Sequence, residues 1–484
     1  MMRKAPAVTY RTKILCTVGP AIASKEKLRA VLEAGASAFR LNMSHGNHEM
    51  HARIIELIRS LEKELNVVIP IVADIQGPKL RVGDLPNGEV MLRPGKPVYF
   101  ASVRKWQELG RPPDVIPLQF PTLAQDVKPG NVLLFDDGLL QVRVEQVRNG
   151  IVKAVVIDGG ILKSRKGINV PGVALTLPAF TPKDRRDVRF ALEHQCDYIA
   201  ISFVRSEKDV QAVRRFIHRQ QPAVEPWLIA KIEKPEAVNN IEAILHVSDG
   251  IMIARGDLGV EIPAAEVPIV QKRIIRMCNE RAKLVITATQ MLESMVHNPR
   301  PTRAEASDVA NAVLDGTDVV MLSAETSVGA YPVEAVAYMR MICSAAEREL
   351  PQWHPRSEPK GWSTRDQRPI AIAKAAVEIA RNLPVAALAI LTYSGETLRQ
   401  VAAQRPQPSL FAVTYDQTIA RRVKLLWGVV PLLFPKFTNT DEAIEQIKQR
   451  LAAEFFPKGS RVVITLGRPL QQKVRTNMIA IEQL

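Results

Sequence analysis

Two charged side chains two positions apart, Lys231 and Glu233, stand in the segment AKIEK, and Asp257 follows in ARGDLG. Residues two apart on a strand face the same side, so this cation and carboxylate meet there. If the two segments are neighbouring strands, Glu233 and Asp257 form a carboxylate pair suited to a hard cation such as Mg2+ or Mn2+. The alternative is an ordinary Lys–Glu ion pair beside an Asp in a turn. The combination of both motifs favours the metal site.

Further cations follow other strand-like segments. In FRLNMSHG, Arg40, Asn42 and Ser44 share the parity of one strand face, and Arg suits bidentate contact with phosphate. In DIQGPKLR, Asp74 is followed by Lys79 and Arg81, a second group of cations beside a carboxylate. Together they indicate an anionic, phosphorylated ligand. The alternative for the first segment is a helix start capped by Ser44 or Asn47, which is compatible with a ligand site.

Hydroxyl groups complete the set, with Thr289 in ITATQM and Ser323 beside Glu325 in LSAET. A hydroxyl there relays a proton or binds phosphate, and packing is the alternative for Thr289. Cations and a metal pair are what phosphoryl transfer needs, because that chemistry depends on positioning and charge neutralisation. The sequence has no Gly-x-x-x-x-Gly-Lys-Ser/Thr loop and no His-Arg-Asp triplet, which excludes P-loop enzymes and protein kinases.

Eight apolar strand-like segments must position these side chains, and helix-length stretches separate all but the third and fourth. This pattern predicts an α/β fold with a (β/α)8 barrel, whose active site lies at the C-terminal ends of the strands. The segments begin at Thr12, Ser37, Pro70, Tyr198, Pro226, Gly250, Leu284 and Val319. The polar residues at their ends are Arg40, Asp74, Ser202, Lys231, Glu233, Asp257, Thr289 and Glu325.

The rest of the chain divides around that barrel. Residues 82–177 show short β-like runs broken by Gly, Pro and Asp-Gly turns, with no helical period. They predict an inserted all-β domain, a small β-barrel that can act as a lid on the active-site face. The catalytic barrel is then discontinuous, 1–81 and 178–350. Polar, Pro-rich residues 351–369 form a linker, and alternating helices and strands in 370–484 predict a C-terminal open α/β sheet.

Composition narrows the classes of partner. The 484 residues carry a formal net charge of +15, but the basic residues are dispersed and not interleaved with aromatics, so we expect no nucleic-acid partner. No apolar run approaches the roughly 20 residues of a membrane helix, and the N-terminus lacks a secretory signal. The four cysteines are far apart and fit buried thiols. We expect a cytoplasmic protein without a membrane partner.

The motifs together resemble one family, the pyruvate kinases. The matching segments include TKILCTVGPA, FRLNMSHG, DIQGPK, AKIEKPEAV, DGIMIARGDLGVEIP, ITATQMLESM and PTRAEASDVANAVLDGTDVVMLSAET, in family order and spacing. The insertion and the C-terminal unit also fit the family, so the resemblance covers nearly the whole chain. It implies phosphoryl transfer from phosphoenolpyruvate to ADP, giving pyruvate and ATP, the last step of glycolysis. It also implies a homotetramer.

The resemblance implies a role for each matching residue. Lys231 and Arg40 bind the phosphoryl group in transfer, and Glu233 with Asp257 holds the divalent metal. Backbone amides near Gly256 anchor the substrate carboxylate. Thr289 is linked through water to protonation of the enolate carbon, and Ser323 extends that relay. The implied nucleotide-binding residues are Arg81, His45, Lys166 and Asn42, and Asp137 is implied as a lid residue.

One departure from the family concerns a monovalent cation. In potassium-dependent members, Glu follows the Gly-Pro pair and Thr follows the Asp, whereas this chain has Lys79 and Ile75. The ammonium of Lys79 can replace K+ beside Asn42, Ser44 and Asp74, so we predict activity without K+. The alternative is that Lys79 points elsewhere and K+ still binds.

A second departure concerns regulation. The segment TYSGET resembles the family's sugar-phosphate effector loop, but Glu396 adds a negative charge, and GRPLQQKVRTN lacks the later glycines of the second effector loop. We predict an anionic effector, a sugar phosphate or a nucleotide, and the alternative is a domain used only for assembly. The candidate effector residues are Thr392, Ser394, Gly395, Thr397 and Arg468.

Two other functions remain open from the sequence. A metal-dependent lyase or aldolase acting on a pyruvate enolate uses a similar barrel, but the lid and Lys231 count against it, and a requirement for ADP separates the two. An inactive paralogue serving as a scaffold is the other alternative, although every expected catalytic position is filled.

Overall fold

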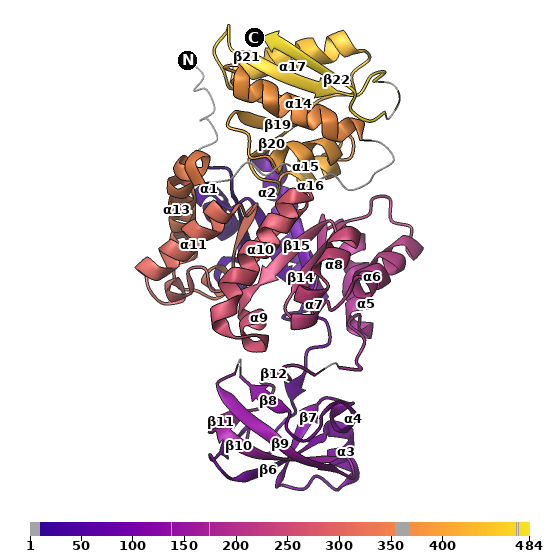
Figure 1. Ribbon diagram of the computed structural model, residues 1–484, viewed down its shortest axis with the longest axis vertical. Helices are drawn as coiled ribbons and strands as arrows, with labels where there is room; N and C mark the ends of the chain where they lie inside the picture. The colour runs from indigo at the N-terminus through magenta and orange to yellow at the C-terminus, as the bar shows by residue number, and fades with distance from the viewer. Residues whose placement is uncertain (1–9, 137, 174, 354–366, 471, 473) are drawn as a thin grey trace.

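The computed structural model of the protein describes residues 10–136, 138–173, 175–353, 367–470, 472 and 474–484. Three parts follow one another along its long axis (Figure 1). A β-rich lid lies at one end, a barrel lies in the middle, and the C-terminal domain lies at the other end. Among the described residues, no helix combines the length and the apolar character that a bilayer span requires.

The middle part is a closed barrel of eight parallel strands, which confirms the predicted fold class. All eight predicted strand segments form barrel strands. Their order around the barrel is β1, β2, β3, β13, β14, β15, β16 and β17. Their bounds are Lys13–Val18, Ala38–Asn42, Ile71–Ile75, Tyr198–Ile201, Trp227–Ile232, Gly250–Ala254, Leu284–Ala288 and Val319–Leu322.

The helices around the barrel begin at side-chain caps that the sequence supplies. Ser24 caps α1 (Lys25–Ala34), and Thr181 with Asp184 forms a capping box before α5 (Pro182–Glu193). The remaining barrel helices of four or more residues are α2 His48–Glu64, α6 Glu207–Arg219, α7 Pro235–Asn239, α8 Ile241–Val247, α9 Arg255–Glu261, α10 Val267–Glu280, α11 Arg303–Asp315, α12 Ala324–Ser327 and α13 Pro332–Trp353.

The helix start after β2 settles one alternative left open by the sequence. Asn47 caps α2, and its side chain accepts a hydrogen bond from the Met50 amide. Ser44 is therefore not the cap. It lies in the loop between the strand end and the helix, where it remains a candidate site residue.

The lid consists mainly of one seven-stranded sheet, in the order β12-β8-β9-β10-β6-β7-β4, and a two-stranded sheet of β11 and β5. An isolated bridge between Arg81 and Gly167 joins the two ends of the larger sheet. The strands are β4 Arg81–Val82, β5 Glu89–Leu92, β6 Pro97–Ser102, β7 Val115–Gln119, β8 Val132–Phe135, β9 Leu140–Arg148, β10 Ile151–Asp158, β11 Gly160–Lys163 and β12 Ile168–Asn169.

The insertion consists mainly of β-strands, as expected, with one local difference. Two short helices interrupt it, α3 (Val103–Glu108) and α4 (Leu123–Asp126). Ser102 caps α3 by accepting a hydrogen bond from the Lys105 amide. Segments of four and six residues are too short to show a hydrophobic period, so periodicity could not reveal them.

The C-terminal domain is an open five-stranded sheet, as predicted, in the order β20-β19-β18-β21-β22. Four strands are parallel, and β22 runs antiparallel to β21. The elements are α14 Arg368–Asn382, β18 Ala387–Leu391, α15 Glu396–Ala402, β19 Ser409–Thr414, α16 Gln417–Val423, β20 Val429–Leu433, α17 Thr440–Glu454, β21 Arg461–Leu466 and β22 Met478–Gln483.

The predicted linker is shorter at both ends than the sequence suggested. Helix α13 continues to Trp353, and α14 begins at Arg368. A proline at the second position of α14 suits the first helical turn, where its missing amide hydrogen costs nothing. The middle of the predicted linker, 354–366, lies outside the described residues.

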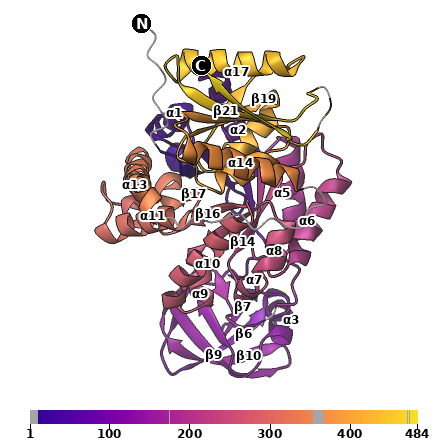
Figure 2. The same cartoon turned by 45° about the horizontal axis from the view of Figure 1, so that its top comes forward.

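One apolar cluster joins the barrel to the C-terminal domain. Side chains from inside the barrel, among them Leu15 and Ile229, are buried in the same cluster as Leu388 and Val423 of the C-terminal sheet and helices. The C-terminal domain therefore closes the N-terminal end of the barrel, opposite to the lid (Figures 1 and 2). Burial of this surface couples the two domains and leaves the other end of the barrel open for chemistry.

A buried lysine lies at this domain junction. Lys13, the first residue of β1, donates from Nζ to the Val429 carbonyl at 2.9 Å. Burial, followed by repulsion from Lys424, lowers the pKa of Lys13 to about 7, while Glu347 and Asp318 act in the opposite sense. The junction therefore holds a cation whose charge is costly near neutral pH.

This charge predicts a pH dependence of stability. Between pH about 7 and the ordinary lysine value of 10.5, the unfolded chain binds a proton that folded Lys13 has released. The contribution of Lys13 to the free energy of unfolding therefore rises with pH across that window and is least favourable below it. We expect Lys13→Met to flatten this dependence in unfolding measurements from pH 7 to 10. The exposed control Lys96→Met should keep the wild-type slope, and an equally steep slope in Lys13→Met would contradict the assignment.

Candidate active site

Lys231, at the C-terminal end of β14, is the centre of the site. Its Nζ lies 2.8 Å from Glu233 Oε1 and 3.2 Å from Asp74 Oδ1. It also donates to Ser202 Oγ at 2.7 Å. Burial alone would lower the pKa of Lys231, but the Asp74 and Glu233 carboxylates outweigh it and raise the pKa above its usual range. The ammonium therefore stays charged although its side chain is only 10% exposed.

Arg40 extends the charged network to β2. Its Nε donates to Asp74 Oδ2 at 2.7 Å, and one terminal nitrogen donates to Thr17 Oγ1 at 3.0 Å. The two oxygens of Asp74 therefore hold two different cations. Burial opposes ionisation of Asp74, but Lys231 and Arg40 together lower the pKa of this carboxyl. The pairing fixes both cations at the strand ends.

Glu233 and Asp257 come from neighbouring strands, as predicted. Glu233 Oε2 accepts from the Phe203 amide at 2.7 Å, and Asp257 lies in the first turn of α9, directly after β15. Burial and the neighbouring Asp257 charge raise the pKa of Glu233, while Lys231 acts in the opposite sense. A cation between the carboxylates would relieve this repulsion, so the donor set fits a hard divalent metal.

The described residues contain no group of three or more His, Cys, Asp or Glu side chains arranged to hold a metal. A metal at Glu233 and Asp257 would therefore take two protein carboxylates, with the remaining ligands from substrate and water. That arrangement is the one Mg2+ commonly adopts beside phosphate groups.

The hydroxyl residues lie on the opposite side of Asp257. Thr289 has a left-handed backbone, with φ of 69°. Its Oγ1 accepts from the Gly256 amide at 2.7 Å and donates to the Ala288 carbonyl at 2.6 Å. Ser323 Oγ is buried without a hydrogen-bond partner among the described residues, whereas the Ser323 amide donates to Glu325. The unpaired hydroxyl is free to bond a ligand or water.

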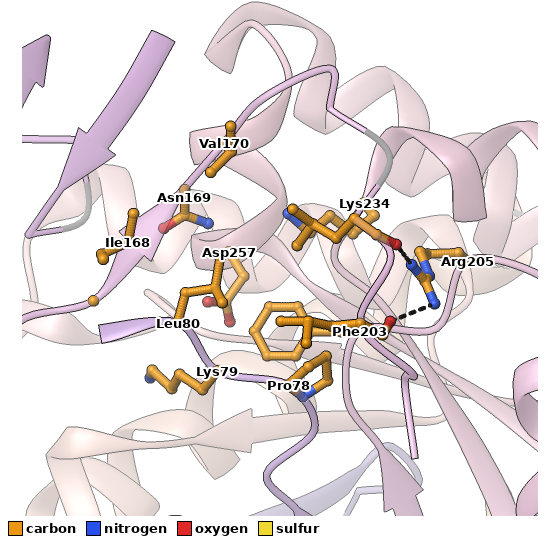
Figure 3. A pocket seen from close by; sticks show the side chains of 13 residues that line it. Pro78, Lys79, Leu80, Ile168, Asn169, Val170, Phe203, Arg205, Lys234 and Asp257 are labelled. Carbon is orange, nitrogen blue, oxygen red and sulfur yellow. Dashed lines mark hydrogen bonds between the residues drawn. The ribbon is translucent and has the colours of Figure 1, made fainter. Parts of the chain in front are cut away.

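A pocket lies between the barrel mouth and the base of the lid (Figure 3). Asp257, Phe203 and Lys234 line it from the barrel, and Asn169 lines it from β12 of the lid. The buried carboxylate of Glu261 accepts from Lys234 Nζ at 2.5 Å and from Asn169 Nδ2 at 2.9 Å. One carboxylate therefore ties the lid to the loop that follows Glu233.

The residues expected at the nucleotide lie around this junction. Arg81 donates to the Arg165 carbonyl at 3.0 Å, and Lys166 donates to Asp136 at 2.7 Å. Burial, then Lys79, Arg81 and Arg40, lowers the pKa of His45, which places that ring among the cations. Asn42 Oδ1 accepts from the Ser44 amide at 3.2 Å. Asp137 lies outside the described residues.

Lys79 is exposed and lines the pocket, with its side chain extending away from Phe203 (Figure 3). Within the ranges that the structure describes, its ammonium makes no hydrogen bond or ion pair. Asp74, the carboxylate of the expected monovalent-cation group, is instead paired with Arg40 and Lys231. The structure therefore does not bring Lys79 onto Asp74.

The candidate effector residues lie in two segments of the C-terminal domain that contact each other. The first is the loop before α15 with the first turn of that helix, and the second is the loop after β21. The Thr397 and Thr476 hydroxyls lie 2.7 Å apart. Thr392 Oγ1 accepts from the Gly395 amide at 2.8 Å, and Ser394 Oγ accepts from the Glu396 amide. In the second loop, the Arg468 amide donates to Asn477 at 2.8 Å. The hydroxyls of the first loop mostly satisfy its own backbone.

Comparisons with known proteins show which family the chain belongs to. The family model "Pyruvate kinase, barrel domain" matches residues 9–336, and "Pyruvate kinase, alpha/beta domain" matches residues 370–482. The chain belongs to the pyruvate kinase family. The pyruvate kinase of Geobacillus stearothermophilus is 43% identical over 477 residues, which are 97% of this chain and 80% of that protein.

Matches to two further relatives cover nearly the whole of both chains. The pyruvate kinase of Clostridium acetobutylicum is 40% identical over 473 residues, 98% of this chain and 99% of that protein. A crystal structure of a pyruvate kinase from Cryptosporidium parvum superposes with a TM-score of 0.89 at 33% identity, covering 99% of this chain and 98% of that one. The family assignment therefore applies to all three parts of the chain.

Sequence reasoning missed three residues of this family member's site. Thr17 supports Arg40, the Phe203 amide supports Glu233, and Arg255 bonds the carbonyls of Thr289 and Gln290. Thr17 had a detectable signal, since it follows the apolar part of the first strand segment. The other two had none, because one contact uses a backbone amide and the other depends on where a loop turns.

The double pairing of Asp74 predicts a large stability effect. We expect Asp74→Asn to lower the free energy of unfolding by about 3 kcal/mol, because it leaves two buried cations without their shared carboxylate. Denaturant unfolding of the variant measures this effect. The matched control is Asp114→Asn at an exposed lid position, which should change stability little. Equal stability of the two variants would show that Asp74 does not hold the cations together.

Proposed function

We propose that this pyruvate kinase family member transfers the phosphoryl group of phosphoenolpyruvate to ADP, giving pyruvate and ATP, the last step of glycolysis. The observation that carries the proposal is the Lys231 ammonium, held charged between Asp74 and Glu233 beside the Arg40 guanidinium. Two buried cations at one barrel mouth provide binding for an anionic phosphoryl group.

The transfer breaks the bond between phosphorus and the enol oxygen and forms a bond between phosphorus and a terminal ADP oxygen. Lys231 and Arg40 neutralise charge on the phosphoryl oxygens during this exchange. Their partners hold them in place, so little reorganisation is needed as charge develops. Phosphoryl transfer depends mainly on such positioning, which explains why no covalent nucleophile is needed.

Glu233 and Asp257 are the residues that would hold the divalent metal, Mg2+ or Mn2+. When bound, the metal supplies Lewis-acid stabilisation of substrate oxygens. The proposal is supported by the hard oxygen donors and by the mutual repulsion of the two carboxylates. The Gly256 amide lies in the first turn of α9 beside Asp257, which supports anchoring of the substrate carboxylate next to the metal-binding pair.

The enolate left after transfer must gain a proton at its terminal carbon. Thr289 stands at the strand end expected for this step, with its hydroxyl orientation set by Gly256 and Ala288. The buried hydroxyl of Ser323 continues the relay towards water. Both residues thus move or orient a proton and carry no phosphoryl group.

We place the nucleotide between the barrel mouth and the lid, with Arg81, His45, Lys166 and Asn42 as its expected contacts. The lid excludes water when it closes, which protects the transferring group from hydrolysis. Glu261 accepts hydrogen bonds from Asn169 of the lid and from Lys234, which follows Glu233. These bonds support a lid whose position is coupled to the proposed metal-binding residue Glu233. Homotetramer formation and an anionic effector at the C-terminal loops remain part of the proposal.

We further propose that the enzyme works without K+. The support is electrostatic, since Asp74 already pairs with two cations and Lys79 adds a third positive charge near His45. A site that carries this much fixed positive charge has little need of a monovalent cation. The exposed position of Lys79 makes the ammonium act through space and not as a direct ligand.

The activity is tested by pyruvate formation from phosphoenolpyruvate, ADP and Mg2+. We expect turnover that requires ADP, and we expect Lys231→Met to reduce kcat by about 1,000-fold because it removes a buried charge from the phosphoryl site. The matched control is Lys96→Met, which removes an exposed lysine in the lid. We expect this variant to turn over at the wild-type rate. Turnover independent of ADP would favour a lyase, and wild-type turnover in Lys231→Met would overturn the assigned role.

The potassium proposal has a separate test. We expect rates in Tris buffer with and without K+, at constant ionic strength, to agree within about a factor of two. Lys79→Glu should lower the K+-free rate about tenfold, with recovery on adding K+. Activation of the wild type by K+ from near-zero activity would contradict the proposal and leave the kinase assignment intact.

A further inference from the structure

Thr289 and Gln290 both adopt left-handed backbone conformations, with φ of 69° and 54°. Side chains with a Cβ rarely adopt this region, and a β-branched residue such as Thr is a clear outlier there. Such a conformation persists only where surrounding contacts hold it. The contacts that hold this turn therefore control where the Thr289 hydroxyl lies.

The guanidinium of Arg255 provides those contacts. It donates to the Thr289 carbonyl at 2.7 Å and 3.2 Å from two nitrogens and to the Gln290 carbonyl at 3.2 Å. The side chain is only 9% exposed. Both carbonyls belong to the two left-handed residues, so one planar group fixes the orientation of two consecutive peptide planes.

The guanidinium also contacts groups outside the turn's two carbonyls. Asp308 of α11 lies 2.7 Å from it, and Gln271 of α10 accepts from the same nitrogen at 3.3 Å. Met291 Sδ accepts from the nitrogen that also bonds Thr289 and Gln290. The nitrogen that contacts Asp308 and Gln271 is therefore not one of the two that bond the turn.

The residue after Arg255 holds Thr289 from the other side. The Gly256 amide donates to Thr289 Oγ1 at 2.7 Å. The start of α9 therefore holds Thr289 twice, with the Arg255 side chain on its carbonyl and the Gly256 amide on its hydroxyl. Because Asp257 follows directly, the same two residues set the spacing between the proton-relay hydroxyl and the carboxylate pair.

We propose that Arg255 is a positioning residue for the proton-transfer step, acting through the left-handed turn at Thr289. This inference rests on the proposed function, since it concerns protonation of the enolate carbon. In that step the enolate electron pair forms a C–H bond with a proton delivered from water along the hydroxyl relay. Arg255 contacts neither the substrate nor the transferred proton. It positions the Thr289 hydroxyl, which takes part in the proton relay.

The test is a double-mutant cycle between Arg255→Lys and Thr289→Ala. A lysine keeps the positive charge, but its single ammonium cannot replace the planar fork, in which one nitrogen faces Asp308 and another faces the two carbonyls. We expect each single variant to lower kcat by about 10- to 100-fold, the size of effect expected when a reacting group is misplaced by about 1 Å. If Arg255 acts through Thr289, adding Arg255→Lys to Thr289→Ala costs less than about threefold more. A double variant whose losses multiply fully would overturn the proposal.

A matched control separates positioning from general support. Asp308→Asn weakens the contact between Arg255 and α11 but leaves the bonds to the turn, so we expect kcat within about threefold of wild type. If Asp308→Asn lowers kcat as much as Arg255→Lys, and melting temperatures fall in parallel, Arg255 only braces the helices. Exchange of pyruvate methyl protons with deuterated water, followed by NMR, should slow in Arg255→Lys at least as much as overall turnover. Unchanged exchange would also overturn the inference.

A second readout does not depend on activity. In crystal structures, we expect residues 289 and 290 to leave the left-handed region in Arg255→Lys and to keep it in Asp308→Asn. An unchanged turn in Arg255→Lys would contradict the inference whatever the reaction. Absence of wild-type turnover with phosphoenolpyruvate and ADP, combined with the expected change in the turn, would overturn the proposed function alone.

Discussion

The ion pairs of Lys231 with Asp74 and Glu233 are the interaction on which the site depends. An isolated ammonium is costly to bury, and here two carboxylates and a serine hydroxyl compensate for its desolvation. Because Asp74 also holds Arg40, the two cations cannot be arranged independently. Any change that moves β3 relative to β14 would disturb both cations at once.

The barrel makes this arrangement possible by placing successive strand ends side by side. Polar contacts run from Thr17 on β1 through Arg40 and Asp74 to Lys231 on β14. Lys231 also pairs with Glu233, and after the next strand the Gly256 amide, beside Asp257, bonds Thr289. The C-terminal domain closes the other end of the barrel, where an apolar cluster surrounds the few buried charges such as Lys13.

Much of this site could be predicted from sequence because two simple rules determine it. Strand parity places Lys231 and Glu233 on one face, and barrel topology brings strand ends together. The rules fail where a position depends on a turn or on a long side chain. Arg255 follows β15 but reaches the next strand's loop, and Lys79, predicted beside Asp74, lies exposed because Arg40 and Lys231 already bond that carboxylate. Likewise, helices α3 and α4 of the lid are too short for a period to appear.

The most direct test of the central claim is the protonation state of the Lys231 ammonium, followed by 15N NMR of lysine-labelled protein with Lys231→Met to assign the signal. The account predicts that Lys231 keeps its proton at pH values where exposed lysines lose theirs, because Asp74 and Glu233 outweigh the cost of burial. Loss of the proton at or below the pH at which exposed lysines titrate would contradict it. In that case the carboxylates would not compensate for burial, and the site would lack the fixed charge proposed to receive the phosphoryl group.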